Sequence, residues 1–69
     1  MANEILKQRI RRLRQATGMS VFDLALKCNL RPQSIYNYEA GAYIPTSGNA
    51  LALAQALNVS VDYLLTGKD

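Results

Sequence analysis

Apolar residues recur at helical intervals along most of the chain. Leu6, Ile10 and Leu13 lie four and three positions apart, which places them on one face of a helix. No stretch alternates in the way that a half-buried strand does. The pattern therefore predicts five short helices and an all-α fold. The apolar sets of the other four helices are Leu24, Ala25 and Cys28; Ile35 and Tyr38; Ala50, Leu53, Ala54 and Leu57; and Leu64 with Leu65.

Capping residues set the bounds of the central pair of helices. Ser20 precedes Asp23 by three positions, the pattern of a capping box at a helix start. Pro32 suits the first position of a helix, and Gly41 supplies a left-handed stop. The two predicted helices span 21–28 and 32–40, with a break at Asn29, and a short turn between two helices is the geometry of a helix-turn-helix.

The other three helices are bounded by residues of the same kinds. A cap and a stop are predicted at Asn3 and Gly18 for the first helix, at Thr46 and Asn58 for the fourth, and at Ser60 and Gly67 for the fifth. Because 69 residues suffice for one small domain, we expect a single domain over 1–69, with the helix-turn-helix unit at about 20–41.

The composition fits a folded globular domain, because 49% of the residues are hydrophobic and 19% are charged. The one cysteine, Cys28, has no partner for an internal disulfide and lies on an apolar face, so we expect it in the core. No apolar run approaches the ~20 residues of a membrane span, and the N-terminal sequence lacks a signal-peptide pattern. These features predict a cytoplasmic protein that does not associate with membranes.

The residues that catalysis requires are scarce. The chain has no histidine, the commonest general base and metal ligand, and one cysteine cannot supply a zinc site. Its five carboxylates are scattered, and no glycine-rich phosphate loop occurs. We therefore expect no enzyme, no metal, no cofactor and no small-molecule ligand.

Positive charge is concentrated in the first half of the chain. Residues 1–31 carry seven basic and two acidic side chains, whereas residues 32–69 carry one basic and three acidic ones. A basic lobe of this kind suits a polyanionic partner, and it equally suits a solvated helix face. Four of the basic residues lie off the apolar stripe of the first helix: Lys7, Arg9, Arg11 and Arg12.

Short motifs in the centre of the chain occur in a specific order. Leu24-Ala25 lies in the first helix of the predicted unit, Gln33-Ser34-Ile35 begins the second, and Tyr38-Glu39-Ala40-Gly41 ends it. In these motifs the chain resembles the phage-repressor/Cro-type (XRE) helix-turn-helix DNA-binding family, from about Leu6 to Gly67. The resemblance implies a compact five-helix, lambda-repressor-like domain and sequence-specific binding of double-stranded DNA by a small transcriptional regulator. Repression needs only occupancy of a site that overlaps a promoter, so we expect a repressor rather than an activator.

The second helix of a helix-turn-helix lies in the major groove of DNA, so the residues at its exposed start are candidate base contacts. Gln33 matches adenine N6 and N7, Arg31 can reach guanine or a phosphate, and Asn37 lies one turn further on. Each residue alone is also typical of an ordinary exposed position, but together they favour DNA binding. The candidate DNA-binding residues are Arg31, Pro32, Gln33, Ser34, Tyr36 and Asn37, with Ser20 and Val21 at the start of the preceding helix.

The resemblance also implies two contacts outside the recognition helix. Arg14 and Glu39 match a pair of oppositely charged residues in the family, which predicts a largely buried salt bridge with a structural role. Val61 matches the family's dimer contact, with Tyr63 and Tyr43 as neighbours. Val61 and Tyr63 also suit core positions, and the core is the preferred assignment for Tyr63. Family members act as dimers on pseudo-palindromic operators, so we expect a weak homodimer that forms mainly on DNA.

Two departures from the family pattern remove phosphate contacts. Val21 stands where many relatives carry glutamine, and the linker 42–45 contains no cation. We therefore expect weak electrostatic attraction to DNA and a shallow salt dependence. An alternative function is a protein-interaction module on the same scaffold that modulates a larger regulator. Four apolar residues would mark its binding surface if they were exposed and contiguous: Val21, Phe22, Tyr43 and Ile44.

Overall fold

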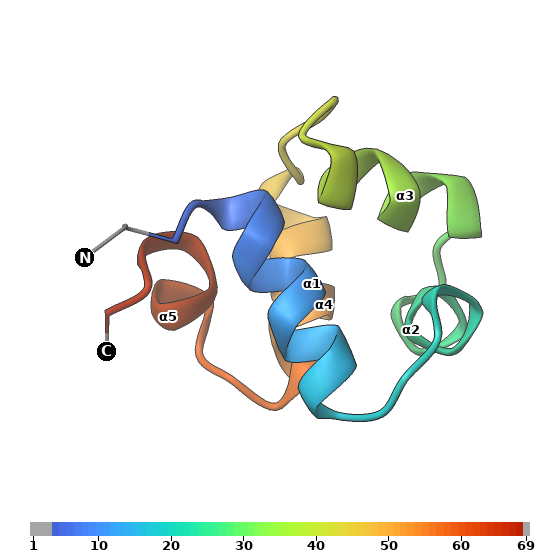
Figure 1. The fold of residues 1–69 in the computed structure, drawn as a ribbon, viewed down its shortest axis with the longest axis horizontal. Coiled ribbons are helices and arrows are strands. Elements are labelled where there is room, and N and C mark those ends of the chain that lie inside the picture. The colour runs from blue at the N-terminus through green and yellow to red at the C-terminus, as the bar shows by residue number, and fades with distance from the viewer. Residues whose placement is uncertain (1–3, 69) are drawn as a thin grey trace.

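In a computed structural model, which describes residues 4–68, the chain forms five helices and, within that range, no strand (Figure 1). The helices are α1 (Leu6–Ala16), α2 (Val21–Cys28), α3 (Pro32–Ala40), α4 (Ser47–Leu57) and α5 (Val61–Thr66). The all-α prediction is therefore confirmed, and α2 to α5 begin and end where their caps and stops predict. The predicted cap of the first helix, Asn3, lies outside the described residues. The residue before α1 is Ile5, whose N–H donates to Gln8 Oε1 over 3.1 Å.

Side chains close the N-termini of α2, α4 and α5. Ser20 Oγ accepts from the Asp23 N–H over 3.0 Å, and Asp23 Oδ2 accepts from the Ser20 N–H over 3.1 Å, so the predicted capping box is present. Thr46 and Ser60 cap their helices through single hydrogen bonds of 3.3 and 3.0 Å. Each cap satisfies a backbone donor that has no partner within its own helix.

Residues in the left-handed backbone region end α2, α3, α4 and α5. Asn29 and Asn58 have φ values of 56° and 60°. Gly41 has a φ of 77°, and the Lys7 side chain crosses so close that an added Cβ would lie 2.8 Å from Lys7 Cδ. Position 41 therefore favours glycine for its backbone conformation, whereas the flexible end of the Lys7 side chain can move away from an added Cβ.

One core joins all five helices. α1 contacts α3 and α5, α2 contacts α3 and α4, and α4 contacts α5, with α1 crossing the middle of the molecule (Figure 1). Most of the predicted core residues are buried, but Leu6 is only partly buried and Leu65 is exposed. Burial of this apolar surface is the main force that holds the short helices together. Each helix contributes one large side chain with almost no exposure: Ile10, Leu24, Ile35, Leu53 and Leu64.

Two residues lie deeper than the sequence predicts. Val21 is 9% exposed, and as the first residue of α2 it falls in phase with Leu24, Ala25 and Cys28 on the buried face. Arg9 was expected on the solvated side of the first helix, but it is 5% exposed. Its guanidinium group donates to the Leu64 carbonyl in α5 and to the Glu4 carbonyl, and these bonds compensate in part for the loss of water.

Candidate nucleic-acid interface

The helix α3 has one buried and one exposed face. Ile35, Tyr38 and Glu39 are buried against the rest of the molecule. Gln33 and Tyr36 are exposed, and Asn37, which shares their side of the helix, is partly exposed. The polar residues that the sequence assigns to DNA therefore lie together on the outer face of α3, with Ser34 partly exposed at its edge.

A hydrogen bond joins two of these residues. Gln33 Nε2 donates to Asn37 Oδ1 over 3.0 Å, a contact between residues four positions apart on one helical face. A carboxamide carries two N–H donors and one carbonyl acceptor. Gln33 therefore keeps its carbonyl oxygen and one N–H for a partner outside the chain.

The start of α3 lacks a side-chain cap of the kind that closes α2, α4 and α5. Arg31 is the residue before the helix, makes no side-chain capping bond and is exposed. Its guanidinium group makes no ion pair or hydrogen bond with any residue from 4 to 68. Pro32 occupies the first helical position and is partly exposed, where its missing N–H leaves no donor to satisfy. A free cation and a rigid helix start thus stand beside Gln33.

The start of α2 presents fewer groups for binding an anion than the sequence suggests. The Ser20 side chain and N–H are both engaged in the capping box with Asp23, although the hydroxyl proton remains able to donate. The Val21 side chain is in the core. What remains for an anion at this helix start is the Ser20 hydroxyl and the first backbone N–H groups of α2, which have no acceptor within the helix.

The predicted pair of Arg14 and Glu39 is present and ties α3 to α1. Arg14 Nε lies 2.6 Å from Glu39 Oε2, and Nη2 lies 3.0 Å from Oε1, which is a bidentate contact. The Glu39 side chain is 3% exposed and that of Arg14 is 14% exposed. The hydrogen bonds that Arg14 donates to the Glu39 carboxylate raise the pKa of Arg14. Arg11 adds a longer contact of 3.3 Å to the same carboxylate, and Arg14 Nη1 also donates to the Met19 carbonyl over 3.0 Å.

A second polar cluster, which the sequence did not predict, ties α1 to α5. Arg9 Nη1 donates to the Leu64 carbonyl over 2.9 Å, and Nη2 donates to the Glu4 carbonyl over 2.6 Å. Arg12 makes a bidentate contact with the Glu4 carboxylate, at 2.6 and 3.0 Å, and its Nη2 lies 2.7 Å from the Tyr63 hydroxyl oxygen. The Arg12 hydrogen bond is the main cause that holds the pKa of Glu4 below its usual value. No motif reveals the central contact, because the acceptor for Arg9 is a backbone carbonyl.

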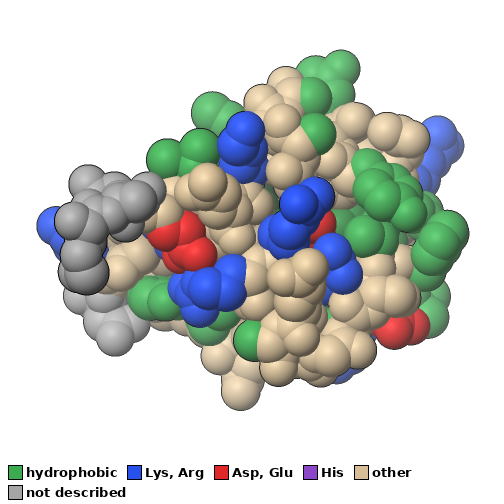
Figure 2. Space-filling view, viewed as in Figure 1, with side chains coloured by type: hydrophobic (Ala, Val, Ile, Leu, Met, Phe, Trp, Pro, Cys, Tyr) green, Lys and Arg blue, Asp and Glu red, His purple; other side chains and the backbone are tan. Residues whose placement is uncertain are grey.

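Ion pairs engage most of the positive charge of α1. Figure 2 shows acidic side chains adjoining basic ones at two separate places on one face of the molecule. A charge held by an internal carboxylate contributes less to the field that attracts a distant polyanion, so the basic lobe seen in the sequence is only partly available to DNA. Four pairs are involved: Arg9–Glu4, Arg12–Glu4, Arg11–Glu39 and Arg14–Glu39.

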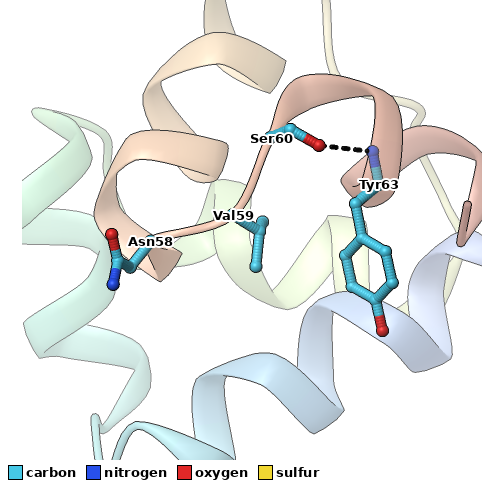
Figure 3. Close-up of a pocket in the computed structure, with 4 residues that line it drawn as sticks. All are labelled: Asn58, Val59, Ser60 and Tyr63. Atoms are coloured by element: carbon cyan, nitrogen blue, oxygen red, sulfur yellow. Dashed lines mark hydrogen bonds between the residues drawn. The ribbon is translucent and has the colours of Figure 1, made fainter. Parts of the chain in front are cut away.

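The three residues predicted for a dimer contact lie on two elements. Val61 and Tyr63 are partly buried on α5, whereas Tyr43, in the linker between α3 and α4, is 65% exposed. Tyr63 lines an open hollow of about 410 Å³ between α4 and α5. Figure 3 shows its ring pointing toward α1 while its N–H donates to Ser60 Oγ. Tyr63 thus packs on the core, as its alternative assignment expected, and still borders a surface hollow.

The four apolar residues suggested for a protein-binding surface do not form one. Val21 is buried, so it does not meet the condition of exposure that this surface requires. Phe22 is exposed on α2 beside Leu26, where Figure 2 shows hydrophobic side chains gathered at the right of the molecule. Tyr43 and Ile44 lie on the linker at the top of Figure 1, away from α2, and border a separate hollow near the start of α1. No observation therefore joins these residues into a single surface.

The described residues contain no cluster of potential metal ligands and no membrane-spanning helix. Among residues 4–68, no three His, Cys, Asp or Glu side chains come together as metal ligands would. In the same range no helix has the length and apolar character to cross a bilayer. Cys28 is buried in the core as predicted, and its burial raises the pKa of the thiol.

Residues 10–64 match the family model described as Helix-turn-helix. The chain is 41% identical over 59 residues to vegetative-specific protein H7 of Dictyostelium discoideum, covering 86% of this chain and 57% of H7. It is 38% identical over 64 residues to the HTH-type transcriptional regulator ImmR of Bacillus subtilis, covering 93% of this chain and 50% of ImmR. The chain thus spans about half the length of these relatives.

Among solved structures, the chain is similar to the P22 c2 repressor in a crystal structure with a synthetic operator. The TM-score is 0.91 with 30% sequence identity, and the alignment covers 96% of this chain and 100% of the repressor chain. The agreement extends over all five helices, so the lambda-repressor-like arrangement expected from the sequence is confirmed.

Proposed function

Because this chain belongs to the helix-turn-helix family, we propose that it binds double-stranded DNA at specific sequences and regulates transcription. The observation that carries the proposal is the outer face of α3. There Arg31, Gln33 and Asn37 keep donors and acceptors that bond to no residue from 4 to 68. The opposite face of the same helix is fixed to α1 by the buried Arg14–Glu39 pair. A helix with one anchored face and one polar exposed face suits insertion into the major groove.

The roles of the residues on α3 follow from their chemistry. Gln33 pairs with the N6 and N7 edge of adenine, and Arg31 contacts guanine O6 and N7 or a neighbouring phosphate. Ser34 and Tyr36 donate to phosphates or base edges, and Pro32 fixes the backbone from which these side chains project.

Contacts with phosphate are few in this proposal. The Ser20 hydroxyl and the first N–H groups of α2, including that of Val21, bind one phosphate at the positive end of the helix dipole. Lys27 and Arg31 add cations, whereas the linker 42–45 has none. With Lys27 and Arg31 as its phosphate-binding cations, a dimer would neutralise about four phosphates and lose roughly 10²-fold in affinity between 50 and 200 mM salt, against 10³–10⁵-fold where six to ten are neutralised.

A homodimer would let two weak recognition units bind one operator. Val61 and the hollow beside Tyr63 supply a surface on α5 that a second copy can share across a two-fold axis. Tyr43 is exposed enough to join that contact. The dimer would place two α3 helices about 34 Å apart, one turn of DNA, on a pseudo-palindromic site.

Repression is the simpler regulatory outcome, since occupancy of a site that overlaps a promoter blocks transcription without any further contact. A regulator of this kind acts where the promoter is, which for a bacterial gene is the cytoplasm. Residues 1–69 would act as a single DNA-binding domain, and no catalytic step is required of it. Binding to a small ligand is likewise not needed for occupancy alone.

Selection of bound duplexes from a random pool tests the proposal. The expected result is enrichment of a two-fold symmetric motif with half-sites one helical turn apart. The variant Arg31→Ala should bind the selected duplex more weakly, while Lys68→Ala, which removes a cation at the far end of the chain, should bind as the original does. Failure of the pool to converge on any motif would rule out sequence-specific recognition.

A further inference from the structure

We propose that Asn37 is a positioning residue that holds the Gln33 carboxamide ready to read an adenine. The inference rests on the proposed DNA-binding function and adds to it a division of labour within α3. Gln33 contacts the base, and Asn37 acts through Gln33. The two residues would then specify one A·T base pair as a unit.

The hydrogen bond between the two carboxamides is the starting point. Gln33 Nε2 donates to Asn37 Oδ1 over 3.0 Å on the exposed side of α3. An unrestrained glutamine at an exposed position samples many rotamers and must lose that freedom when it binds. The bond restricts Gln33 before DNA arrives, so less entropy is lost on contact with the base.

The groups left over on Gln33 match adenine. One N–H of Nε2 is used by Asn37, which leaves Oε1 as an acceptor and the second N–H as a donor. Adenine presents the complementary pattern in the major groove, with the N6 amino group as donor and N7 as acceptor. A bidentate contact with adenine uses Oε1 and the N–H on the same side of the carboxamide, so we assign the other N–H to Asn37. In that arrangement the bond to Asn37 organises Gln33 without using the edge that recognition needs.

The other carboxamide contacts within residues 4–68 have structural roles, which sets this pair apart. Gln8 Oε1 accepts from the Ile5 N–H at the start of α1, and Asn49 Nδ2 donates to the Tyr38 hydroxyl oxygen over 2.8 Å in a partly buried contact between α4 and α3. The Gln33–Asn37 bond joins no two elements. An exposed pair within one helix contributes little to stability, so its main consequence is the orientation of Gln33.

Base discrimination by matched variants tests the proposal. The probes are the duplex selected by the unmodified protein and duplexes with single base-pair changes across each half-site. Gln33→Ala locates the base pair that Gln33 reads, which should be A·T with a preference of roughly 5- to 150-fold, the range for one bidentate contact. Gln55→Ala is the matched control, because it removes an exposed carboxamide on α4. Alanine favours helix, so these variants keep α3 and α4 folded.

The variants at position 37 separate positioning from direct contact. Asn37→Ala should reduce the preference at the Gln33 base pair toward that of Gln33→Ala, and the double variant should lose no more. Asn37→Asp still accepts the bond from Gln33, so it should keep that preference while binding every duplex more weakly because of its added negative charge. Gln55→Ala should change neither quantity.

Two results would overturn the inference and leave the proposed function intact. One is full retention of the preference in Asn37→Ala. The other is its loss in Asn37→Asp as well as in Asn37→Ala, which would show that the Asn37 donors contact a base themselves. A protein that selects no motif at all would overturn the proposed function instead, and the inference with it.

Discussion

The two polar flanks of α1 hold different partners by different means. Lys7, Arg11 and Arg14 lie on the flank toward α3, where Glu39 accepts from both arginines. Arg9 and Arg12 lie on the opposite flank, where they hold Glu4 and α5. The apolar stripe of α1 runs between the two flanks and faces the core.

The flanks differ most in the burial of their carboxylates. The Glu39 side chain is 3% exposed, whereas that of Glu4 is 29% exposed. Water screens the charges of the Glu4 cluster, so its ion pairs contribute little to stability. Glu39 is shielded from water, so the loss of its charged partner would cost more free energy of folding. The helix that carries the proposed recognition face is therefore fixed by the stronger of the two attachments, and α5 is attached more loosely.

Breaking the α3 flank should have the largest effect. Glu39→Gln removes the charge that balances Arg14 and should lower the free energy of unfolding by about 3–5 kcal/mol. Denaturant unfolding measures the loss, and a double-mutant cycle with Arg14→Met isolates the coupling between the two residues. Absence of coupling in that cycle would show that the pair does not hold α3.

Breaking the α5 flank should cost less. Arg9→Met keeps much of the buried stem but removes the charged donor to the Leu64 carbonyl, for an expected loss of about 1.5–3 kcal/mol. Hydrogen exchange should show the amides of α5 opening more often, with little change in α3. An equal increase in both helices would mean that the two flanks are not separate attachments.

Two glycines test the left-handed end of α3. Gly41→Ala forces an alanine into a left-handed conformation and should destabilise the fold by roughly 1–2 kcal/mol. Gly48→Ala is the matched control, since Gly48 lies within α4 and a Cβ there meets no atom within 4 Å. Thermal unfolding should show that the free energy of unfolding of the control is unchanged or raised by up to about 1 kcal/mol. Similar behaviour of the two variants would contradict the role given to position 41.

Acid should act on the α5 flank through Glu4. Folding lowers the pKa of Glu4, chiefly through its hydrogen bond with Arg12, so the stabilisation is complete above the unfolded value of about 4.3 and is lost as the pH falls through the lower folded value. Melting temperatures of the original protein and of Glu4→Gln should therefore differ at pH 6 and converge toward pH 3. A difference that stays constant with pH would exclude this linkage.

The sequence predicts the helices well because caps, stops and apolar period agree at each boundary. It could also have predicted the burial of Val21, which shares the period of Leu24 and Cys28. The Arg14–Glu39 pair follows from the family resemblance, and the structure supplies its geometry. The role of Arg9 could not be predicted, because a backbone carbonyl brought near by the fold leaves no mark in the sequence.

The outer face of α3 likewise combines a feature that the sequence predicts with one that it does not. Polar residues at positions 33 and 37 indicate an exposed recognition surface, but only the structure reveals that their side chains bond to each other. Periodicity decides which residues face outward. It does not decide which rotamer each amide side chain adopts, since that depends on the atoms around it.

Backbone amide shifts recorded by NMR during titration with the selected duplex show directly whether DNA contacts the outer face of α3. We expect the largest changes at saturation at residues 31–37, with smaller ones at the start of α2. Saturable binding that leaves the amides of 31–37 unchanged, with the changes instead around Phe22 and Leu26, would contradict this expectation.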